Sequence, residues 1–447
     1  MFQTVLVANR GEIARRIIRT LHAMRIKAIA VYSEADAGAP HVREADQAAL
    51  LGPAPAAESY LDGSRVLAAA IRTGAQAIHP GYGFLAENAA FARSVIDAGL
   101  GWIGPSPECV EAMGDKINAR NLMAAAGVPV APGTREPVSD VEAAVAAAAD
   151  IGYPVMVKAA AGGGGIGMGV ADDETSLRTA FETARSRGRR FFGSPSILLE
   201  RHLPHARHVE IQILGLADGR VVALGERDCS VQRRHQKVAE ETPSPGVRPE
   251  LRARMLAAAV RAGEAVGYRG AGTVECLVDP AAQSFVFLEM NTRLQVEHPV
   301  TELVTGLDLV AEQLRVAAGA APGFDPASPP GPTGHAIELR VYAEDPVRFL
   351  PGPGTITGWS EPVGEGIRVD SGYTKGDVVS PHYDPLMAKL CAHGADRDEA
   401  LARLRQAVAT FTVEGPKCNL PFFTELLRNE EFVSGNYDTG LIGRMRP

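Results

Sequence analysis

The sequence predicts an α/β protein with an α+β central part, and two observations carry this prediction. In residues 1–110, strand-like and helix-like segments alternate, which is typical of a parallel sheet with crossover helices. From about 208 to 315 the pattern is mostly short strands with one Ala-rich helix near 250–266. Stretches rich in proline and glycine, at 127–137 and 319–334, separate these regions. Because 447 residues exceed one simple core, we expect two to four packed domains.

The expected elements follow from hydrophobic periodicity. In the N-terminal region the strands are 4–8, 27–32 and 75–78, and the helices are 12–24, 64–71 and 88–98. Farther along, helices are expected at 139–150, 397–410 and 420–428, and strands at 155–158, 197–200, 335–343 and 366–370. The turn after the first strand, residues 9–12, lacks the three-glycine dinucleotide fingerprint. A Rossmann dehydrogenase is therefore not supported.

Composition excludes several classes of protein. Hydrophobic residues make up 46% and charged residues 22%, which is ordinary for a soluble globular chain. The net charge of -8 argues against an extended nucleic-acid face. The five cysteines form no C-x-x-C pair, which indicates a reducing compartment. No signal peptide and no apolar run of membrane-spanning length is recognisable, so we expect a cytoplasmic protein without a membrane partner.

The expected strand 155–158 ends at Lys158, and a run of four glycines follows at 162–165. Backbone N–H groups without side chains suit wrapping around phosphate oxygens, and a lysine can place its charge against the same phosphates. No Lys-Ser/Thr pair follows, so this is not a Walker A loop. The alternatives are a hairpin lid over a nucleotide and a mobile surface turn, and the glycines alone do not separate them.

Two β-rich runs, 273–279 and 285–291, are joined by a turn at 280–284. If the hairpin is centred on Ala282, Glu275 and Glu289 lie directly opposite one another. Like charges placed so destabilise a sheet unless a cation lies between them. The hairpin therefore predicts a pair of carboxylates that needs a positive partner.

Mg²⁺ is the natural cation for this hairpin, because carboxylate and amide oxygens are its usual protein ligands and Asn291 lies one strand period beyond Glu289. The alternative is an exposed charged face. Leu277 and Phe287, which flank the two carboxylates on the expected face, are apolar and favour the metal site.

Immediately downstream, Arg293, Gln295 and Glu297 share the parity of the hairpin residues if the chain stays extended. A guanidinium offers a planar fork that matches a small carboxylate-like anion. Glu297 could then act as general base toward that anion.

Two other signals have weaker explanations. His202, His205 and His208 repeat every third residue, but Pro204 breaks a helical face, so a metal site is disfavoured. The basic segment 232–237 lies in an acidic chain without interleaved aromatics, so a phosphate pocket is a better interpretation than nucleic-acid binding.

Together these segments resemble biotin carboxylase, a member of the ATP-grasp superfamily, and the similarity runs from end to end. The segments that carry it are 8–14, 79–85, 114–116, the glycine loop, 208–212, 226–230, 232–237 and 289–302. The resemblance implies an N-terminal α/β domain (1–113), an ATP-grasp domain (114–330) with a mobile lid at about 132–202, and a C-terminal biotin carboxylase domain (331–447).

The resemblance also implies roles for individual residues. ATP would be bound by Lys116, Lys158, Gly163, Gly164, Gly165, Glu200, Arg201, Leu203, His208, Gln232, His235, Glu275, Leu277 and Glu289. Two Mg²⁺ (or Mn²⁺) ions would be held by Glu275, Glu289 and Asn291. Bicarbonate would be bound by Lys237, Arg293, Gln295 and Val296, and biotin by Tyr82, Arg340 and Asp384. Glu297 would deprotonate bicarbonate and Arg340 would stabilise the biotin oxyanion, with Lys237 and Arg293 assisting catalysis.

The implied partners are a biotinyl carrier protein, a carboxyltransferase subunit of an acetyl-CoA or other acyl-CoA carboxylase, and a second copy in a homodimer. No Met-Lys-Met biotinylation motif occurs in the sequence, so we expect the carrier to act in trans. The chain departs from many members at Ile166 and Gly169, where basic residues are usual, and at Arg201, where lysine is usual.

Two rival functions are weighed against this one. Another ATP-grasp ligase would share the lid and the hairpin but should lack Arg293, Gln295 and Glu297 paired with Arg340. A catalytically inactive nucleotide-binding regulator is disfavoured because Lys237 and the acidic residues are retained.

Overall fold

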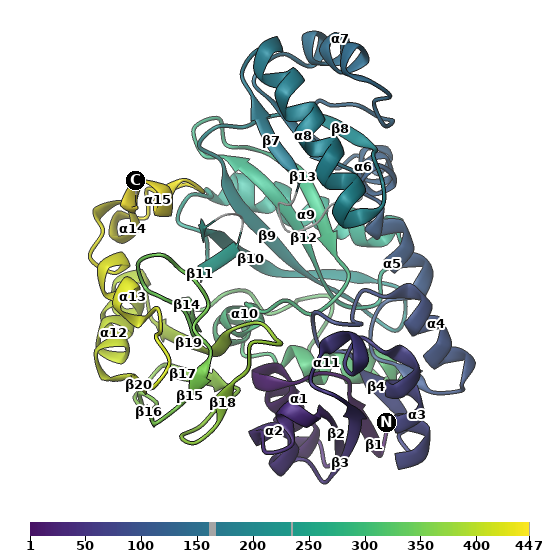
Figure 1. Ribbon diagram of the computed structural model, residues 1–447, viewed down its shortest axis with the longest axis vertical. Helices are drawn as coiled ribbons and strands as arrows, with labels where there is room; N and C mark the ends of the chain where they lie inside the picture. The colour runs from purple at the N-terminus through teal and green to yellow at the C-terminus, as the bar shows by residue number, and fades with distance from the viewer. Residues whose placement is uncertain (161–166, 234–235, 447) are drawn as a thin grey trace.

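The computed structural model describes residues 1–160, 167–233 and 236–446 (Figure 1). The N-terminal region forms a five-stranded parallel sheet of order β3-β2-β1-β4-β5. Its elements are β1 (Thr4–Val7), α1 (Gly11–Ala23), β2 (Lys27–Ser33), α2 (Pro40–Glu44), β3 (Gln47–Gly52), α3 (Gly63–Thr73), β4 (Ala77–His79), α4 (Ala89–Asp97) and β5 (Gly101–Trp102). The predicted parallel sheet with crossover helices is confirmed. The sequence analysis missed β3 and β5, which are an edge strand with mixed burial and a strand of only two residues.

An antiparallel sheet of eight strands forms the centre of the molecule, in the order β13-β12-β9-β10-β11-β14-β19-β17. The strands are β9 (Arg207–Gly215), β10 (Val221–Arg233), β11 (Gln236–Thr242), β12 (Gly270–Asp279), β13 (Ser284–Asn291), β14 (His335–Tyr342), β17 (Ile367–Ser371) and β19 (Leu386–Gly394). The expectation of short strands was wrong for β10, which has 13 residues. Its buried polar residues interrupt the apolar pattern and hide its length.

The helices that accompany this sheet are α5 (Pro107–Gly114), α6 (Lys116–Ala125), α9 (Pro249–Ala265), α10 (His298–Thr305) and α11 (Leu309–Ala317). The predicted Ala-rich helix is confirmed as α9, whereas α10 and α11 were not predicted. Residues of α1, α11 and the central sheet share one apolar core, including Ile17, Leu214 and Leu314. The N-terminal region and the central sheet are therefore packed against each other.

The eight-stranded sheet continues past residue 331, because β14, β19 and β17 extend it beyond β11. The C-terminal region adds β15 (Gly354–Thr355), β16 (Gly358–Ser360), β18 (Val378–Val379), α12 (Arg397–Thr410), β20 (Thr412–Glu414), α13 (Leu420–Leu426), α14 (Glu430–Ser434) and α15 (Leu441–Met445). The predicted helices at 397–410 and 420–428 are confirmed as α12 and α13. Side chains on β12, β11 and β14 are thus held on one hydrogen-bonded surface.

A smaller unit with its own core stands apart at the top of Figure 1. It consists of α7 (Val141–Ile151), β6 (Val155–Ala159), β7 (Met168–Ala171), α8 (Glu174–Phe192) and β8 (Ile197–Arg201), with strand order β7-β6-β8. The sequence analysis missed α8, although Asp173 and Ser176 form a capping box before it and Leu177 and Phe181 follow with helical spacing. We call this unit the lid unit, because it lies within the segment of about 132–202 that was expected to form a lid. Residues 161–166 of the glycine loop lie outside the described residues.

The hairpin of β12 and β13 confirms that Glu275 lies directly opposite Glu289, but its register is not uniform. Next to the turn, Asp279 pairs with Ser284, so that half of the hairpin is not centred on Ala282. A bulge between Glu275 and Cys276 shifts the register by one residue. As a result Phe287 pairs with Cys276 and lies in the core, which corrects its expected place beside the carboxylates.

Among the described residues, no helix combines the length and the apolar character that crossing a membrane requires. The five cysteines all fall within the described ranges and are free thiols.

We expect Phe181→Ala, in the core of the lid unit, to destabilise that unit by about 3–5 kcal/mol, because it leaves a cavity among Leu177, Val157 and Ile197. Hydrogen exchange should accelerate between 141 and 201 and stay unchanged in β9–β12. Phe423→Ala, in the C-terminal core, is the matched control and should leave the exchange of the lid unit as it is. Equal acceleration in both regions of the Phe181→Ala protein would show that the lid has no separate core.

Candidate active site

A largely buried lysine, whose side chain is 13% exposed, is surrounded by carboxylates on the central sheet. The Nζ atom of Lys237, on β11, donates hydrogen bonds to Glu210 Oε2 (2.6 Å), Glu275 Oε1 (2.8 Å) and Glu297 Oε1 (2.7 Å). All three carboxylates are buried. Burial opposes the charge on Lys237, but the acidic groups around it outweigh burial and raise its pKa well above the ordinary value. This ammonium therefore joins residues from three separate parts of the chain.

The sheet register explains why cations are required here. Glu210 on β9 is the direct partner of Glu275 on β12, so two carboxylates lie side by side. Besides Lys237, Arg227 compensates this charge through a hydrogen bond from Nε to Glu210 Oε1 at 2.6 Å. Arg227 is completely buried.

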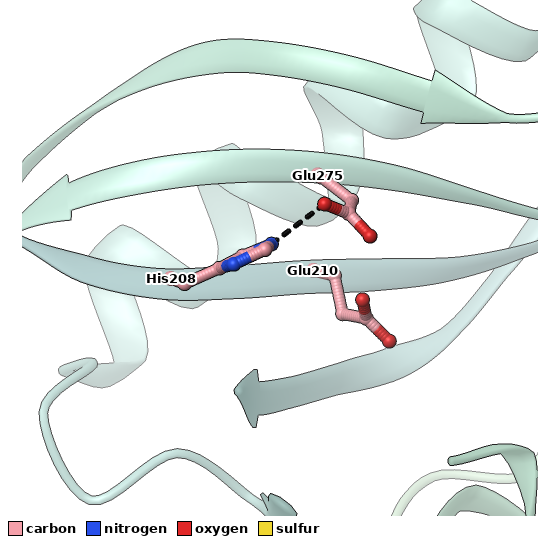
Figure 2. Close-up of side chains that lie close together, drawn as sticks. All are labelled: His208, Glu210 and Glu275. Atoms are coloured by element: carbon pink, nitrogen blue, oxygen red, sulfur yellow. Dashed lines mark hydrogen bonds and ion pairs between the residues drawn. The ribbon is translucent and has the colours of Figure 1, made fainter. Parts of the chain in front are cut away.

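Figure 2 shows how the histidine of β9 joins this cluster. His208 Nε2 lies 2.7 Å from Glu275 Oε2, and the carboxylates of Glu275 and Glu210 project from adjacent strands toward the same space. Donor atoms of the three residues lie within 4.8 Å of one another, as a metal site requires. Burial favours a neutral carboxyl at Glu275, but Lys237 and His208 outweigh burial and hold its pKa well below the ordinary value.

The end of β13 and the segment after it bring a predicted metal ligand and a predicted anion-binding residue to the same carboxylate. Asn291 Nδ2 and Gln295 Nε2 both donate to Glu275 Oε1, at 2.7 and 2.9 Å. Arg293 Nη1 donates to Gln295 Oε1 at 2.7 Å. The premise of an extended chain was wrong, because the segment turns after Asn291 and enters α10 at His298. The side chains converge through this turn rather than through strand alternation.

Glu297 is held by two cations from neighbouring strands. Lys237 contacts its Oε1 atom, and Arg340 on β14 donates from Nη2 to Oε2 at 2.9 Å. Burial would raise the pKa of Glu297, but Lys237 and Arg340 outweigh burial and place it well below its ordinary value. Arg340 Nε also donates to Glu240 Oε1 at 2.6 Å. The predicted base is thus ionised and oriented.

The two predicted phosphate-binding lysines, Lys116 and Lys158, each lie near a glutamate. Lys158 on β6 forms an ion pair with Glu200 on β8, the next strand of the lid unit. Lys116, at the start of α6, lies 3.9 Å from Glu289 Oε2, whose side chain is 41% exposed. Burial lowers the pKa of Lys116. Glu289 is therefore the open edge of the carboxylate cluster.

The remaining predicted ATP-binding residues surround this region. Gln232 pairs with Lys237 across β10 and β11, and Leu277 pairs with His208 across β12 and β9. Arg201 Nη1 donates to Ile151 O at 3.2 Å, so its guanidinium is engaged within the lid unit. Leu203 lies in the connection from β8 to β9. The other predicted residues, Gly163, Gly164, Gly165 and His235, lie outside the described residues.

Besides Arg340, the predicted biotin residues are Tyr82 and Asp384, which come from two further segments of the chain. Tyr82 follows β4 and donates its hydroxyl to Glu12, at the start of α1. Asp384 lies in the loop before β19, where its Oδ1 accepts from the backbone N–H of Leu386 at 2.9 Å. Tyr82 thus follows a strand of the N-terminal sheet, whereas Asp384 precedes a strand of the central sheet.

Four charged residues of the site were not selected from the sequence: Glu87, Glu210, Arg227 and Glu240. Glu87 accepts from Arg293 Nε at 2.8 Å, and the others contact the lysine, the carboxylates or Arg340. For Glu210 a signal existed, because it shares strand parity with His208. Of the three histidines of that group, His208 lies in a candidate metal cluster with Glu210 and Glu275, whereas His202 and His205 belong to none among the described residues.

Glu240 generates a prediction about pH. Burial raises its pKa to about 7 from an ordinary value of 4.5, although Arg340 opposes the shift. The folded protein therefore retains a proton that the unfolded chain releases, and stability falls as pH rises between these two values. Between pH 4.5 and about pH 7, we expect the free energy of unfolding of Glu240→Gln to fall by roughly 1–3 kcal/mol less than that of the wild type. Urea unfolding at several pH values in this interval measures the difference.

The matched control is Glu241→Gln, on the opposite face of the same strand. Burial opposes ionisation of Glu241, but His335 and Arg397 outweigh burial and lower its pKa to about 2. This variant should leave the slope between pH 4.5 and about pH 7 as in the wild type. A wild-type slope in Glu240→Gln would contradict the assignment.

Comparison with known proteins agrees with this geometry along the whole chain. Residues 1–110 match the family described as biotin carboxylase, N-terminal domain, and residues 338–444 match biotin carboxylase C-terminal domain. Residues 115–322 match the carbamoyl-phosphate synthase L chain, ATP binding domain. The two flanking matches separate the chain from the rival ATP-grasp ligases.

Individual relatives cover nearly the full length. Biotin carboxylase 2 of Bacillus subtilis (strain 168) is 51% identical over 442 residues, which is 99% of both chains. A biotin carboxylase–β,γ-ATP complex from Campylobacter jejuni has a TM-score of 0.96 at 42% identity and covers 99% of both chains. The biotin carboxylase domain dimer of Hydrogenobacter thermophilus 2-oxoglutarate carboxylase, solved with MgADP, ADP and bicarbonate, has a TM-score of 0.95 at 42% identity, covering 99% of this chain and 98% of that one. The chain therefore belongs to the biotin carboxylase family of ATP-grasp enzymes.

Proposed function

We propose that this protein uses ATP and bicarbonate to carboxylate N1′ of biotin on a carrier protein in trans. The observation that carries the proposal is the position of Glu297, whose ionised carboxylate is held between Lys237 and Arg340 on adjacent strands. Beside it, the guanidinium of Arg293 and the amide of Gln295 form a donor set suited to a small anion. A base next to an anion site is what activation of bicarbonate requires.

The residues fit a magnesium ion as cofactor. Glu275 and Glu289 are opposed across the hairpin, and Asn291 is hydrogen-bonded to Glu275, so hard oxygen donors gather at one place. The family relative from Hydrogenobacter thermophilus was solved with MgADP. When bound to this set, Mg²⁺ would neutralise the charge of the ATP phosphates. Lys116 and Lys158 would contact the same phosphates.

The proposed reaction begins when Glu297 accepts the proton of bicarbonate. The freed oxygen attacks the γ-phosphorus of ATP, so the bond to ADP breaks and carboxyphosphate forms. Carboxyphosphate then breaks to CO₂ and phosphate, and the phosphate removes the proton from biotin N1′. Arg340 stabilises the negative charge on the biotin oxygen while N1′ bonds to CO₂. These intermediates react with water, which gives a lid that excludes water a physical purpose.

We further propose that the protein is a homodimer and cytoplasmic, and that it serves a carboxyltransferase of an acetyl-CoA or other acyl-CoA carboxylase. The dimeric Hydrogenobacter thermophilus relative supports the oligomeric state. That relative is part of a 2-oxoglutarate carboxylase, so a 2-oxo acid is the competing acceptor for the second half-reaction.

The test of the reaction is phosphate release from ATP, Mg²⁺ and bicarbonate, with and without free biotin. We expect Glu297→Gln to lower the biotin-dependent rate by roughly 10²-fold or more, because the base is lost while the shape is kept. Glu226→Gln, a buried glutamate paired with Arg252, is the matched control and should retain the rate. Biotin-independent release at the full rate in the wild type would refute the proposed function.

A second test addresses the metal. We expect Glu289→Gln to raise the Mg²⁺ concentration for half-maximal activity by about tenfold, because one charged oxygen ligand is replaced by a neutral one. Glu264→Gln, an exposed position on α9, should leave that concentration unchanged. An unchanged Mg²⁺ requirement in Glu289→Gln would remove Glu289 from the site.

A further inference from the structure

Lys389, on β19, is a fully buried lysine that none of the roles above uses. Its Nζ atom lies 3.0 Å from Glu12 Oε2 and donates to the backbone oxygen of Val296 at 2.9 Å. Burial alone favours the neutral amine, but Glu12 and other nearby acids raise the pKa of Lys389, so it stays charged. A buried charge is costly unless it is paired and hydrogen-bonded, so the charge of Lys389 depends on its contacts with Glu12 and Val296.

The position of Lys389 in the sheet places it beside Arg340. The two residues are direct partners across β14 and β19, which lie next to each other in Figure 1. Arg340 contacts the carboxylate of Glu297, and Lys389 contacts the main chain of the preceding residue, Val296. Two neighbouring cations therefore hold two consecutive residues of the turn that leads from β13 into α10.

The other partner of Lys389, Glu12, connects it to Tyr82. Glu12 accepts the hydroxyl of Tyr82 through its second oxygen, and Lys389 Nζ lies 6.0 Å from the centre of the Tyr82 ring. The start of α1 is fixed at this point because the backbone of Gly372 packs against it, where a Cβ atom would approach Glu12 N to 2.7 Å. Glu12 is thus held in place to join Tyr82 to Lys389.

We propose that Lys389, paired with Glu12, is a positioning residue that couples the biotin side of the site to the bicarbonate side. This inference rests on the proposed function, in which Tyr82 belongs to the biotin site and Val296 and Glu297 to the bicarbonate site. Lys389 fixes the main chain that carries the base, and through Glu12 it fixes the tyrosine. Among the contacts of the described residues, Lys389 touches neither Lys116 nor Lys158.

The test is a steady-state comparison of three Michaelis constants in the biotin-dependent reaction. Lys389→Met replaces the side chain by an unbranched one that is a single atom shorter and removes the charge. We expect KM for bicarbonate and KM for free biotin each to rise by about tenfold, which corresponds to the loss of a charged hydrogen bond. KM for ATP should stay within about twofold of the wild-type value, because the lysine does not reach the nucleotide side.

The matched control is Arg252→Met, which removes a cation from the ion pair with buried Glu226 far from these groups. It should lower the melting temperature without moving any KM. Glu12→Gln keeps an acceptor for Tyr82 and drops the charge, so it should move the same two constants in the same direction by a smaller factor. This milder variant decides the question if Lys389→Met does not fold. The double variant should be no worse in KM than Lys389→Met, because the pair is already broken.

Unchanged KM values for bicarbonate and biotin in a folded, active variant would overturn this inference alone. A rise in KM for ATP by the same factor would also overturn it, because it would indicate a general structural role. Wild-type protein without biotin-dependent phosphate release would overturn the proposed function and this inference together.

Discussion

The ammonium of Lys237 among the carboxylates of Glu210, Glu275 and Glu297 is the interaction on which the rest of the site depends. Three acids so close together could not all stay ionised in a buried space without a cation between them. With Lys237 present, Glu275 and Glu297 both keep a pKa well below the ordinary value. The same charge therefore keeps both the proposed metal ligand, Glu275, and the proposed base, Glu297, ionised.

The continuity of the central sheet explains how such different groups stay in register. Glu275 on β12, Lys237 on β11 and Arg340 on β14 are separated only by hydrogen-bonded strands. A ladder of backbone hydrogen bonds fixes their spacing to within the pleat of the sheet. The lid unit, in contrast, packs around its own core, so it contributes Lys158 without being part of that ladder. The central sheet thus holds Glu275, Lys237 and Arg340, whereas Lys158 lies on the separate sheet of the lid unit.

Strand alternation in the sequence predicted some side-chain positions of the site correctly and others wrongly. It placed Glu275 opposite Glu289 correctly, because the far half of the hairpin has the expected register. It misplaced Phe287, because a bulge adds a residue that no periodicity reveals. It also required an extended chain through Arg293, whereas the structure turns there and still delivers the side chain to Gln295. Local patterns predict faces well only where the ladder is regular.

The parallel N-terminal sheet, the carboxylate hairpin and the similarity to biotin carboxylases could all be predicted before the structure, because periodicity and local motifs encode these features. In contrast, the roles of Glu210, Arg227 and Glu240 in the site and the position of Lys389 beside Arg340 became visible only in the folded chain. These residues meet through the order of strands in a sheet, and that order depends on long-range packing rather than on the spacing of residues along the chain.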